Sequence, residues 1–488
     1  MYEIYKAIFS LYKAIFSPYV DHIGMVFFKI CLRAREIILD RPIYTSPSFG
    51  EESTNGTDTD ECFDYWLHRV CHDVKRNDTA IDEVEIDHGG ELCSFDGTDM
   101  RLLTDAMQTN RFVTSLIFRN ITIDGYSAEL LKAMLQSSSN SITNLQMEEI
   151  RGGEGPIAAV LALTLNPKSS IKTLHLKGNH IDALSSRAIC LMLKSNRSLT
   201  ELRLCHNSIN VEGVSHISIG LMGNRTLRVL DLEGNALNDV SVSKISNALV
   251  HNETLAFLCL DFNGFGTFGT RAIASMLKRN RSLKELHLFG NQIDSIGASA
   301  LASSLRHNAT LKTLILSFNN IGNEGAKALA EALTVNHTLT HLSFPSNSIW
   351  NEGLEAFGDC LPEMKGLEQL NVGELYDTPA ADALLKGLKY NTRLSALFLQ
   401  LPICEEYFPE SDEGIDGSSH HSCTTPVEDD IDFFLRLNKS GRSLLHSPTS
   451  APSSLWAEAL GKANNNLSEA GVPDVLYHLI RQKPDLLS

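Results

Sequence analysis

The sequence predicts an α/β solenoid, a curved stack of short units with a parallel sheet on the inside and helices on the outside. The first observation is a pattern, Leu-x-x-Leu-x-Leu-x-x-Asn-x-Ile, that recurs every 28 residues from Ile171 to Leu339. The second is that strong helix formers with helical spacing follow each copy, as in residues 326–333. Because one strand and one helix cannot bury their apolar side alone, neighbouring units must stack.

Seven complete copies of the pattern carry its asparagine, and incomplete copies extend the array at both ends. The complete copies begin at Ile171, Leu199, Leu227, Leu255, Leu283, Leu311 and Leu339. The incomplete copies begin at Ile81, Val113, Ile142, Leu367 and Leu394. We therefore assign residues 81–403 to one repeat domain of about twelve units, each of 28–29 residues.

Each unit is expected to begin with a short strand and a tight turn. Apolar residues at positions 4 and 6 of the unit alternate with other residues, which is the spacing of a strand with one buried face. The asparagine at position 9 is expected to bond backbone groups in the turn, where an unpaired buried group costs about 1–3 kcal/mol. This predicted asparagine ladder consists of Asn179, Asn207, Asn235, Asn263, Asn291, Asn319 and Asn347.

A second asparagine follows the helical part of each unit. It opens an Asn-x-Ser/Thr triplet at Asn196, Asn224, Asn252, Asn280, Asn308 and Asn336. We expect this residue to end the helix in the left-handed conformation, which asparagine and glycine tolerate. Because the chain shows no secretory signal, the triplets are predicted to be structural elements and not glycosylation sites.

The N-terminal residues 1–40 are assigned to an amphipathic helical segment. A tandem copy, Tyr5–Ser10 and Tyr12–Ser17, keeps its aromatic residues near one helix face because the shift is seven residues. We expect this segment to dock on the protein, with weak membrane-surface contact through residues 1–30 as the alternative. Charged residues interrupt every apolar run, so no transmembrane span is predicted.

Four further segments flank the repeats. Residues 41–61 are predicted as a polar linker, and residues 62–80 as a cap that covers the first unit. Residues 404–430 are assigned to an acidic loop or linker, since the stretch up to Asp432 holds ten acidic residues and no lysine or arginine. Residues 431–488 regain helical spacing and are predicted as a helical cap or a docking module.

Composition excludes several classes of protein. The 488 residues include 42 basic and 59 acidic side chains, and the resulting net charge of −17 argues against a nucleic-acid-binding protein. The ten cysteines form no CxxC pair, so reduced thiols are expected in an intracellular protein. We predict a cytoplasmic location, with the nucleus as the alternative, and neither a cofactor nor a metal.

One stretch, Gly264–Gly269, matches the GxGxxG motif of dinucleotide-binding sites. Its last glycine occupies the same position as the turn glycine of other units, such as Gly297 and Gly325, and the βαβ context of a nucleotide site is missing. We interpret the motif as an ordinary turn of the repeat. The chain also contains no GxxxxGK[ST], HExxH or GxSxG motif, and no catalytic residue is predicted.

The repeated Leu-x-x-Leu-x-Leu-x-x-Asn pattern resembles the leucine-rich repeat family, specifically its long ribonuclease-inhibitor-like subclass. Repeats of that kind are also found in intracellular immune receptors and in Ran GTPase-activating protein. The resemblance covers about two thirds of the chain, residues 81–403. It implies a horseshoe-shaped solenoid that binds protein partners on its concave face, and no cofactor.

The concave face is expected to carry the residues at positions 3, 5, 7 and 8 of each unit. At one end of the array these positions form an acidic region that includes Glu85 and Glu148. Near the middle they predict a partner-binding surface with an apolar part (Phe257, Cys259, Phe262, Phe289, Ile315 and Phe318) and a polar part (Arg203, Asp231, Glu233, Asp261, Glu285 and His287). Cys205, His206, Cys259 and His287 suggest a metal, but a separation of two repeats, about 10 Å, is too long for ligands that share one zinc ion.

The leading hypothesis is a non-enzymatic intracellular scaffold that holds a protein partner, favouring a basic one, on this face. The first alternative is a GTPase-activating protein for a small Ran-like GTPase, with Arg203 or Asn371 near the nucleotide. The second is an adaptor that recruits a substrate and docks to other machinery through residues 431–488.

Overall fold

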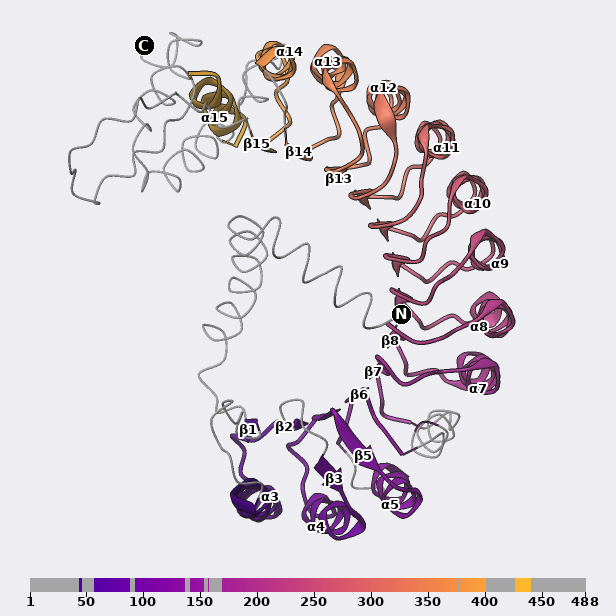
Figure 1. Cartoon of the computed structure of the whole chain (residues 1–488), viewed down its shortest axis with the longest axis vertical. Coiled ribbons are helices and arrows are strands. Elements are labelled where there is room, and N and C mark those ends of the chain that lie inside the picture. Colours follow the sequence, from indigo (N-terminus) through magenta and orange to yellow (C-terminus); the bar gives the residue numbers. More distant parts are fainter. Residues whose placement is uncertain are drawn as a thin grey trace, which may run out of the picture.

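The computed structural model describes residues 44–45, 57–87, 93–136, 141–152, 157, 169–374, 378–400 and 426–439. These residues form an open arc, with strands along its inner edge and helices along its outer edge (Figure 1). The predicted solenoid with an inner parallel sheet and outer helices is therefore confirmed.

The inner sheet contains 13 parallel strands, which follow one another in chain order. They are β1 (Tyr44–Thr45), β2 (Glu83–Asp87), β4 (Ser115–Arg119), β6 (Asn144–Glu148), β7 (Thr173–His175), β8 (Glu201–Arg203), β9 (Val229–Asp231), β10 (Phe257–Cys259), β11 (Glu285–His287), β12 (Thr313–Ile315), β13 (His341–Ser343), β14 (Gln369–Glu374) and β15 (Ala396–Gln400). Leaving β1 aside, each strand belongs to one of the twelve units that the sequence predicts.

The strands pair in a register that brings identical positions of neighbouring units together. Leu258 of β10 lies opposite Leu230 of β9 on one side and Leu286 of β11 on the other. These leucines are at most 1% exposed. Because every unit adds one such residue to a continuous row, removing a single buried leucine side chain is expected to destabilise the stack by about 2–5 kcal/mol.

The outer helices pack side by side along the arc. They are α3 (Thr57–Lys75), α4 (Gly97–Met107), α5 (Gly125–Gln136), α7 (Ala183–Ser195), α8 (Val211–Gly223), α9 (Asp239–Leu249), α10 (Thr267–Leu277), α11 (Ser295–Leu305), α12 (Gly322–Leu333), α13 (Asn351–Cys360), α14 (Thr378–Leu388) and α15 (Pro426–Lys439), with a 3-10 turn η1 (Leu361–Glu363). Several begin with a side-chain cap; Asp294, for example, accepts a hydrogen bond from the N–H of Gly297 at 2.8 Å.

The asparagine ladder at position 9 has the predicted role. The Nδ2 atom of Asn235 donates to the carbonyl oxygens of Leu204 in the preceding unit, at 2.9 Å, and of Leu232 in its own unit, at 3.0 Å. Its backbone N–H donates in turn to Oδ1 of Asn263, at 3.0 Å. The ladder therefore connects neighbouring units through buried hydrogen bonds, each of which contributes about 1 kcal/mol.

The second asparagine, in the Asn-x-Ser/Thr triplets, differs from the prediction. Asn224 has φ −76° and ψ 139°, which is extended and not left-handed backbone. Its Oδ1 accepts hydrogen bonds from the N–H groups of Thr226 and Leu227, and its Nδ2 donates to the carbonyl of Leu193 in the preceding unit. The side chain is thus used to turn the chain from helix into strand, and the left-handed conformation is not needed.

These triplet asparagines are also among the most buried polar residues of the fold. Asn196, Asn224, Asn252, Asn280, Asn308 and Asn336 are 1–4% exposed. For Asn224 to Asn336, the amide nitrogen that a glycan would occupy donates to a backbone carbonyl of the preceding unit at 2.7–2.8 Å. The triplets form a second asparagine ladder, on the side of the units where the helices end.

Two features near the N-terminal end were not predicted. Strands β3 (Cys93–Phe95) and β5 (Ile121–Ile123) form a separate two-stranded parallel sheet beside the main one. In addition, β1 and the start of α3 fall within residues 41–61, which were predicted as a linker. Pairing of Tyr44 with Val84 extends the inner sheet by one strand beyond the first unit.

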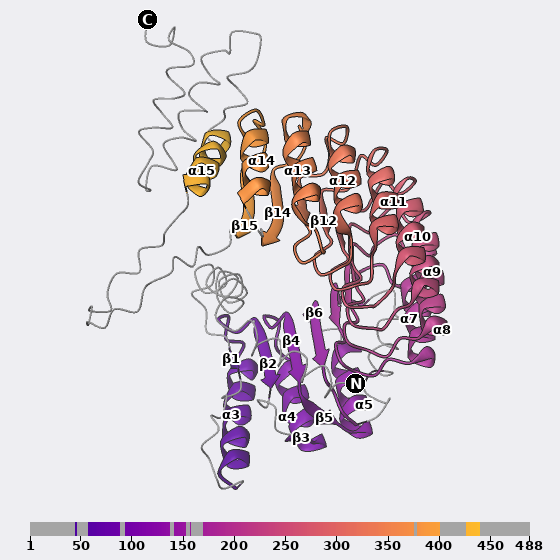
Figure 2. The same cartoon turned by 45° about the horizontal axis from the view of Figure 1, so that its top comes forward.

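Each end of the arc is covered by a helix. Figure 2 shows α3 beside α4 at one end and α15 beside α14 at the other. Leu67 and Val70 of α3 are fully buried, as Ile431 and Leu435 of α15 nearly are. Helix α15 begins at Pro426, inside the segment assigned to the acidic loop.

Several predictions lie outside the described residues. They are the amphipathic segment 1–40 with its membrane contact through residues 1–30, most of the acidic segment 404–430, and the tail after residue 439. In the part of the chain that the structure describes, no helix is both long enough and apolar enough to cross a lipid bilayer.

Candidate functional site

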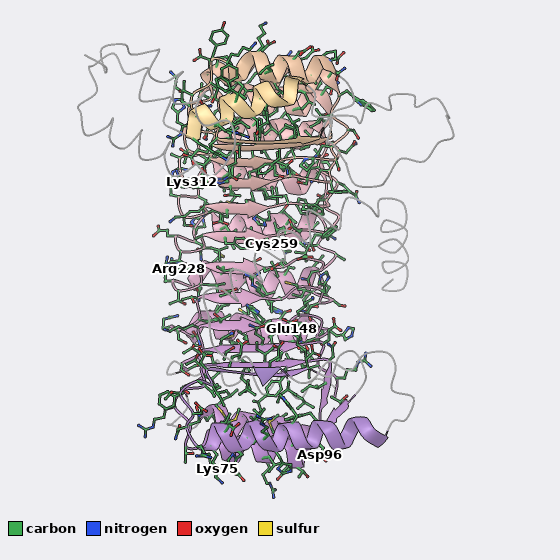
Figure 3. All side chains as sticks on the ribbon, turned by 90° about the vertical axis from the view of Figure 1, so that its left-hand side faces the viewer. Lys75, Asp96, Glu148, Arg228, Cys259 and Lys312 are labelled. Atoms are coloured by element: carbon green, nitrogen blue, oxygen red, sulfur yellow. The ribbon has the colours of Figure 1, made fainter. Side chains whose placement is uncertain are left out.

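The concave face is the inner side of the parallel sheet, and Figure 3 looks onto it. Because neighbouring strands are in register, side chains at the same position of successive units form columns across this face. Position 5 of four successive units gives the column Arg203, Asp231, Cys259 and His287. Residues far apart in the sequence, but one unit apart in the array, are therefore direct neighbours.

Three phenylalanines form a continuous aromatic stack just beyond the ends of β10, β11 and β12. The ring centroids of Phe262 and Phe289 are 4.8 Å apart, and those of Phe289 and Phe318 are also 4.8 Å apart. Phe262 is 41% exposed and Phe318 is 36% exposed, whereas Phe289 is half-buried between them. We call Phe262, Phe289 and Phe318 the aromatic stack.

The backbone holds this stack in place. Phe262 and Phe318 have φ values of 52° and 57°, in the left-handed region that bulky residues rarely adopt. The N–H of Phe262 donates to the carbonyl of Phe289 at 2.8 Å, and the N–H of Phe289 donates to Oδ1 of Asp261 at 2.7 Å. These hydrogen bonds fix the turns, so the rings are positioned before any partner arrives.

The remaining members of the predicted apolar group, Phe257, Ile315 and Cys259, do not belong to the stack. The ring of Phe257 packs edge-to-face against His287, with centroids 4.8 Å apart. Ile315 is half-buried on β12, and Cys259 is only 4% exposed. The exposed apolar surface in this region is therefore provided mainly by Phe262 and Phe318.

The predicted polar residues divide into two groups. In the first, ion pairs within the protein neutralise the charges, and in the second such ion pairs are fewer. Arg203 donates from Nε to Glu201 at 2.7 Å and from Nη1 to Asp231 at 3.2 Å. His175 lies 3.2 Å from the same Glu201 carboxylate. These hydrogen bonds, that of His175 first, lower the pKa of Glu201 to about 2. Arg203 is thus held by two carboxylates of the protein itself.

Asp261, Cys259 and His287 form the second group. Asp261 and His287 are half-buried, and burial is the main cause that raises the pKa of Asp261 to about 6 and lowers the pKa of His287. Burial and the nearby Asp231 carboxylate also raise the pKa of the Cys259 thiol. Among the described residues, Asp261 takes part in no ion pair.

The separation of two repeats that weighed against a metal does not apply to this group. Cys259 and His287 are register partners on adjacent strands, so one unit separates them and not two. A ligand atom of each of Cys259, Asp261 and His287 lies within 4.8 Å of the other two. A second group, Cys205, Asp231 and Glu233, meets the same distance criterion.

The acidic region at the N-terminal end is less negative than its sequence indicates. Arg119 of β4 forms ion pairs with both Glu85 of β2 and Glu148 of β6. The reason is the same register, which places Arg119 and Glu148 opposite each other on adjacent strands. The sequence prediction does not include this arginine, although it occupies a concave-face position of its unit.

The GxGxxG stretch is a structural turn. The N–H groups of Gly266 and Gly269 both donate to Oδ1 of Asp239 in the preceding unit, at 2.9 and 2.8 Å. This carboxylate occupies the N-terminus of α10, where a pyrophosphate would bind in a dinucleotide site. Phe265 between the glycines is buried in the core.

An open arc of stacked strand–helix units, with side chains projecting from its inner sheet, defines the class of solenoid repeat proteins. Five stretches of the chain match a family model described as "Leucine Rich repeat": residues 195–218, 223–246, 279–302, 307–330 and 335–358. The chain therefore contains leucine-rich repeats.

Two solved structures are similar to parts of the chain. One is titled "Leiomodin-1 Actin-Binding Site 2 (ABS2)", with 25% identity and a TM-score of 0.20 over 27% of this chain and 61% of that one. The other is titled "Crystal structure of TLR13-ssRNA13 complex", with 17% identity and a TM-score of 0.38 over 64% of this chain and 46% of that one. The chain thus spans less than two thirds of either. A comparison with curated proteins found no match.

Proposed function

We propose that this protein is a non-enzymatic scaffold that holds a protein partner on its concave face, with the aromatic stack as the central contact. Leucine-rich repeat domains generally mediate protein–protein interaction, and the chain contains such repeats. The observation that carries the proposal is the stack itself, in which two rings that are 41% and 36% exposed flank a third. Rigid, partly exposed aromatic side chains are enriched among the residues that dominate binding energy.

The surroundings of the stack favour a basic partner segment that presents an apolar side chain. Glu285, on the strand between the outer rings, is exposed, and the carboxylate of Asp261 accepts the backbone N–H of Phe289. The whole chain carries a net charge of −17. An apolar anchor would fill the space over the rings, while lysine or arginine next to it would meet the carboxylates and increase the rate of association.

The test uses three phenylalanine-to-aspartate variants of the full chain. Phe262→Asp and Phe318→Asp remove the exposed rings of the stack. Phe268→Asp is the matched control, because Phe268 is 73% exposed but lies on α10, outside the sheet. Partners would be identified by affinity purification from the native cell, and their affinities measured with purified proteins by calorimetry.

The two stack variants are expected to weaken binding by about 30-fold or more, the usual effect of a hot-spot residue, while Phe268→Asp binds like the wild type. Circular dichroism would verify that all three variants are folded. Equal affinity of all three variants and the wild type for every partner would contradict the assignment of the stack.

The two alternatives remain predictions. A GTPase-activating role would need a side chain that can reach a nucleotide, whereas Arg203 is engaged with Glu201 and Asp231. Single-turnover GTP hydrolysis with a panel of small GTPases tests this role, and acceleration would support it. Deletion of residues 431–488 tests the adaptor role, which predicts that partner binding survives and a second association is lost.

We also propose that the repeats belong to the ribonuclease-inhibitor-like subclass and act in the cytoplasm or nucleus. The 28-residue period and a helix in each of the central units support the subclass. Burial of the asparagines in the six Asn-x-Ser/Thr triplets supports an intracellular location, because glycosylation there would require the units to open. Mass spectrometry that finds glycans on these asparagines would contradict this location.

A further inference from the structure

A cluster of three potential metal ligands lies on the concave face beside the aromatic stack. Cys259 ends β10, His287 ends β11, and Asp261 follows β10 by two residues. The register of the sheet makes Cys259 and His287 direct partners, and one ligand atom of each of the three residues lies within 4.8 Å of the other two. We call Cys259, Asp261 and His287 the Cys–Asp–His cluster.

The backbone restricts how these side chains can move. Oδ1 of Asp261 accepts the N–H of Phe289 at 2.7 Å, which orients the carboxylate toward β11. The ring of His287 packs against Phe257 with centroids 4.8 Å apart, so its plane is also fixed. Cys259 is 4% exposed, at the floor of the cluster, whereas the other two residues are half-buried above it.

The neighbouring group of Cys205, Asp231 and Glu233 provides an internal comparison. In that group, Arg203 forms an ion pair with Asp231 at 3.2 Å and His206 lies 3.4 Å from Glu233. The protein therefore supplies its own cationic and imidazole partners to both carboxylates. In the Cys–Asp–His cluster, by contrast, no described lysine or arginine forms an ion pair with Asp261.

We propose that the Cys–Asp–His cluster is a binding site for a single zinc ion. Thiolate, imidazole and carboxylate are the three ligand types that zinc accepts in proteins. On binding, the thiol proton of Cys259 leaves to solvent, and the thiolate and carboxylate together neutralise the two charges of the ion. Bonds of about 2.0–2.3 Å place zinc ligands about 3.3–3.6 Å apart, so binding draws the three side chains together by rotation about their side-chain bonds.

The site would have an open coordination position. Three protein ligands leave the fourth position of a tetrahedral ion to water or to a group from outside the chain. Since position 5 and position 7 side chains project from the inner sheet, this position faces the concave surface next to Phe289. The zinc ion would then lie at the edge of the surface that the aromatic stack provides.

The test measures binding of the metal alone to the full chain at pH 7.5. Zinc affinity is measured by competition with a chromogenic chelator, and the metal-free protein is titrated with cobalt(II), which gives an absorption band from thiolate to metal only when sulfur is a ligand. The variants are Cys259→Ser, Asp261→Asn and His287→Gln. Cys205→Ser is the matched control, because Cys205 is also a buried cysteine and it follows β8, which β9 separates from β10.

We expect one zinc per chain and a thiolate–cobalt band. Each of the three cluster variants should weaken zinc binding by about 10- to 100-fold or more, and Cys259→Ser should also abolish the band. The Cys205→Ser variant should retain both. Asp261→Asn and His287→Gln alter half-buried residues, so they remain informative if Cys259→Ser does not fold.

Three results would overturn the proposal: no zinc binding at micromolar concentration, a cobalt spectrum without the thiolate band, or loss of binding in Cys205→Ser but not in the cluster variants. The test does not depend on the partner of the aromatic stack. Failure of the Phe262→Asp experiment would leave the zinc site unaffected, and absence of zinc would leave the scaffold proposal unaffected.

Discussion

The second asparagine ladder makes a sharp prediction about stability. Asn280 is 2% exposed and satisfies four backbone groups: its Nδ2 donates to the carbonyls of Leu249 and Asn252, and its Oδ1 accepts the N–H groups of Ser282 and Leu283. Asn280→Ala removes all four bonds at once. Three of these bonds are buried, and the one from the N–H of Ser282 is partly buried. At the lower part of the range of about 1–3 kcal/mol for each buried group left without a partner, the variant should lose about 3–5 kcal/mol.

The measurement is urea unfolding followed by circular dichroism, with hydrogen exchange to locate the change. Because each unit contacts only its neighbours, faster exchange should be confined to the region where α9 and α10 end. The matched control is Asn320→Ala, since Asn320 is exposed and its side chain should contribute no more than about 0.5 kcal/mol. A loss of less than about 1 kcal/mol in Asn280→Ala, or equal losses in both variants, would refute the reasoning.

Two further predictions concern the site. Gly290→Ala should destabilise the fold by about 2–3 kcal/mol, because φ is +65° and the new Cβ would lie 2.6 Å from the ring of Phe262. Gly223→Ala, which meets no atom within 4 Å, should instead stabilise by about 0.4–1 kcal/mol in the same urea assay; similar effects of both changes would be inconsistent with this packing. The depressed pKa of Glu201, about 2 against 4.5, predicts a pH effect. Its contribution, about 1–2 kcal/mol after solvent screening, is fully present above pH 4.5 and is lost as the pH falls toward 2. The difference between wild type and Glu201→Gln should therefore shrink over that range, and a difference that does not change with pH would contradict the assignment.

The fold could be predicted from the sequence because the same residue pattern recurs in many units. The leucine spacing and the asparagine at position 9 recur in seven units, and each repetition restricts the strand, the turn and the stacking in the same way. The ends of the array were harder to predict, since β1 and β3 belong to no complete copy of the pattern. Short strands such as Tyr44–Thr45 depend on a neighbour to pair with, and single-strand patterns do not encode that neighbour.

The candidate site could be predicted only in part. Column positions followed directly from the period, which is why the aromatic stack and the polar column were found. The repeat period did not predict which charged side chains form ion pairs, because that depends on side-chain conformation. Arg203 reaches across to Asp231, while no described lysine or arginine forms an ion pair with Asp261. The separation of two units that weighed against a metal holds for Cys205 and Cys259, but it does not hold for Cys259 and His287, which the register places on adjacent strands.

The position of the aromatic stack is explained by a period of two units, which cannot be seen within a single unit. At position 8 the backbone is left-handed in every unit from Asn120 to Ser346, and from Gly178 onward glycine alternates with a large residue: Gly178, His206, Gly234, Phe262, Gly290 and Phe318. A Cβ atom at Gly234 would lie 2.4 Å from the ring of His206, and one at Gly290 would lie 2.6 Å from the ring of Phe262. The rings of His206 and Phe262 therefore each rest on the glycine of the next unit, where a larger residue would clash.

This alternation determines where an aromatic surface can form on the inner sheet. Because Phe262 rests on Gly290, the ring of Phe289 can enter between Phe262 and Phe318, with 4.8 Å between successive centroids. The stack thus needs two phenylalanines that are two units apart and a glycine between them. A substitution at the glycine would move the rings without removing any of them, so the glycine is as much a determinant of the proposed binding surface as the phenylalanines that a partner would touch.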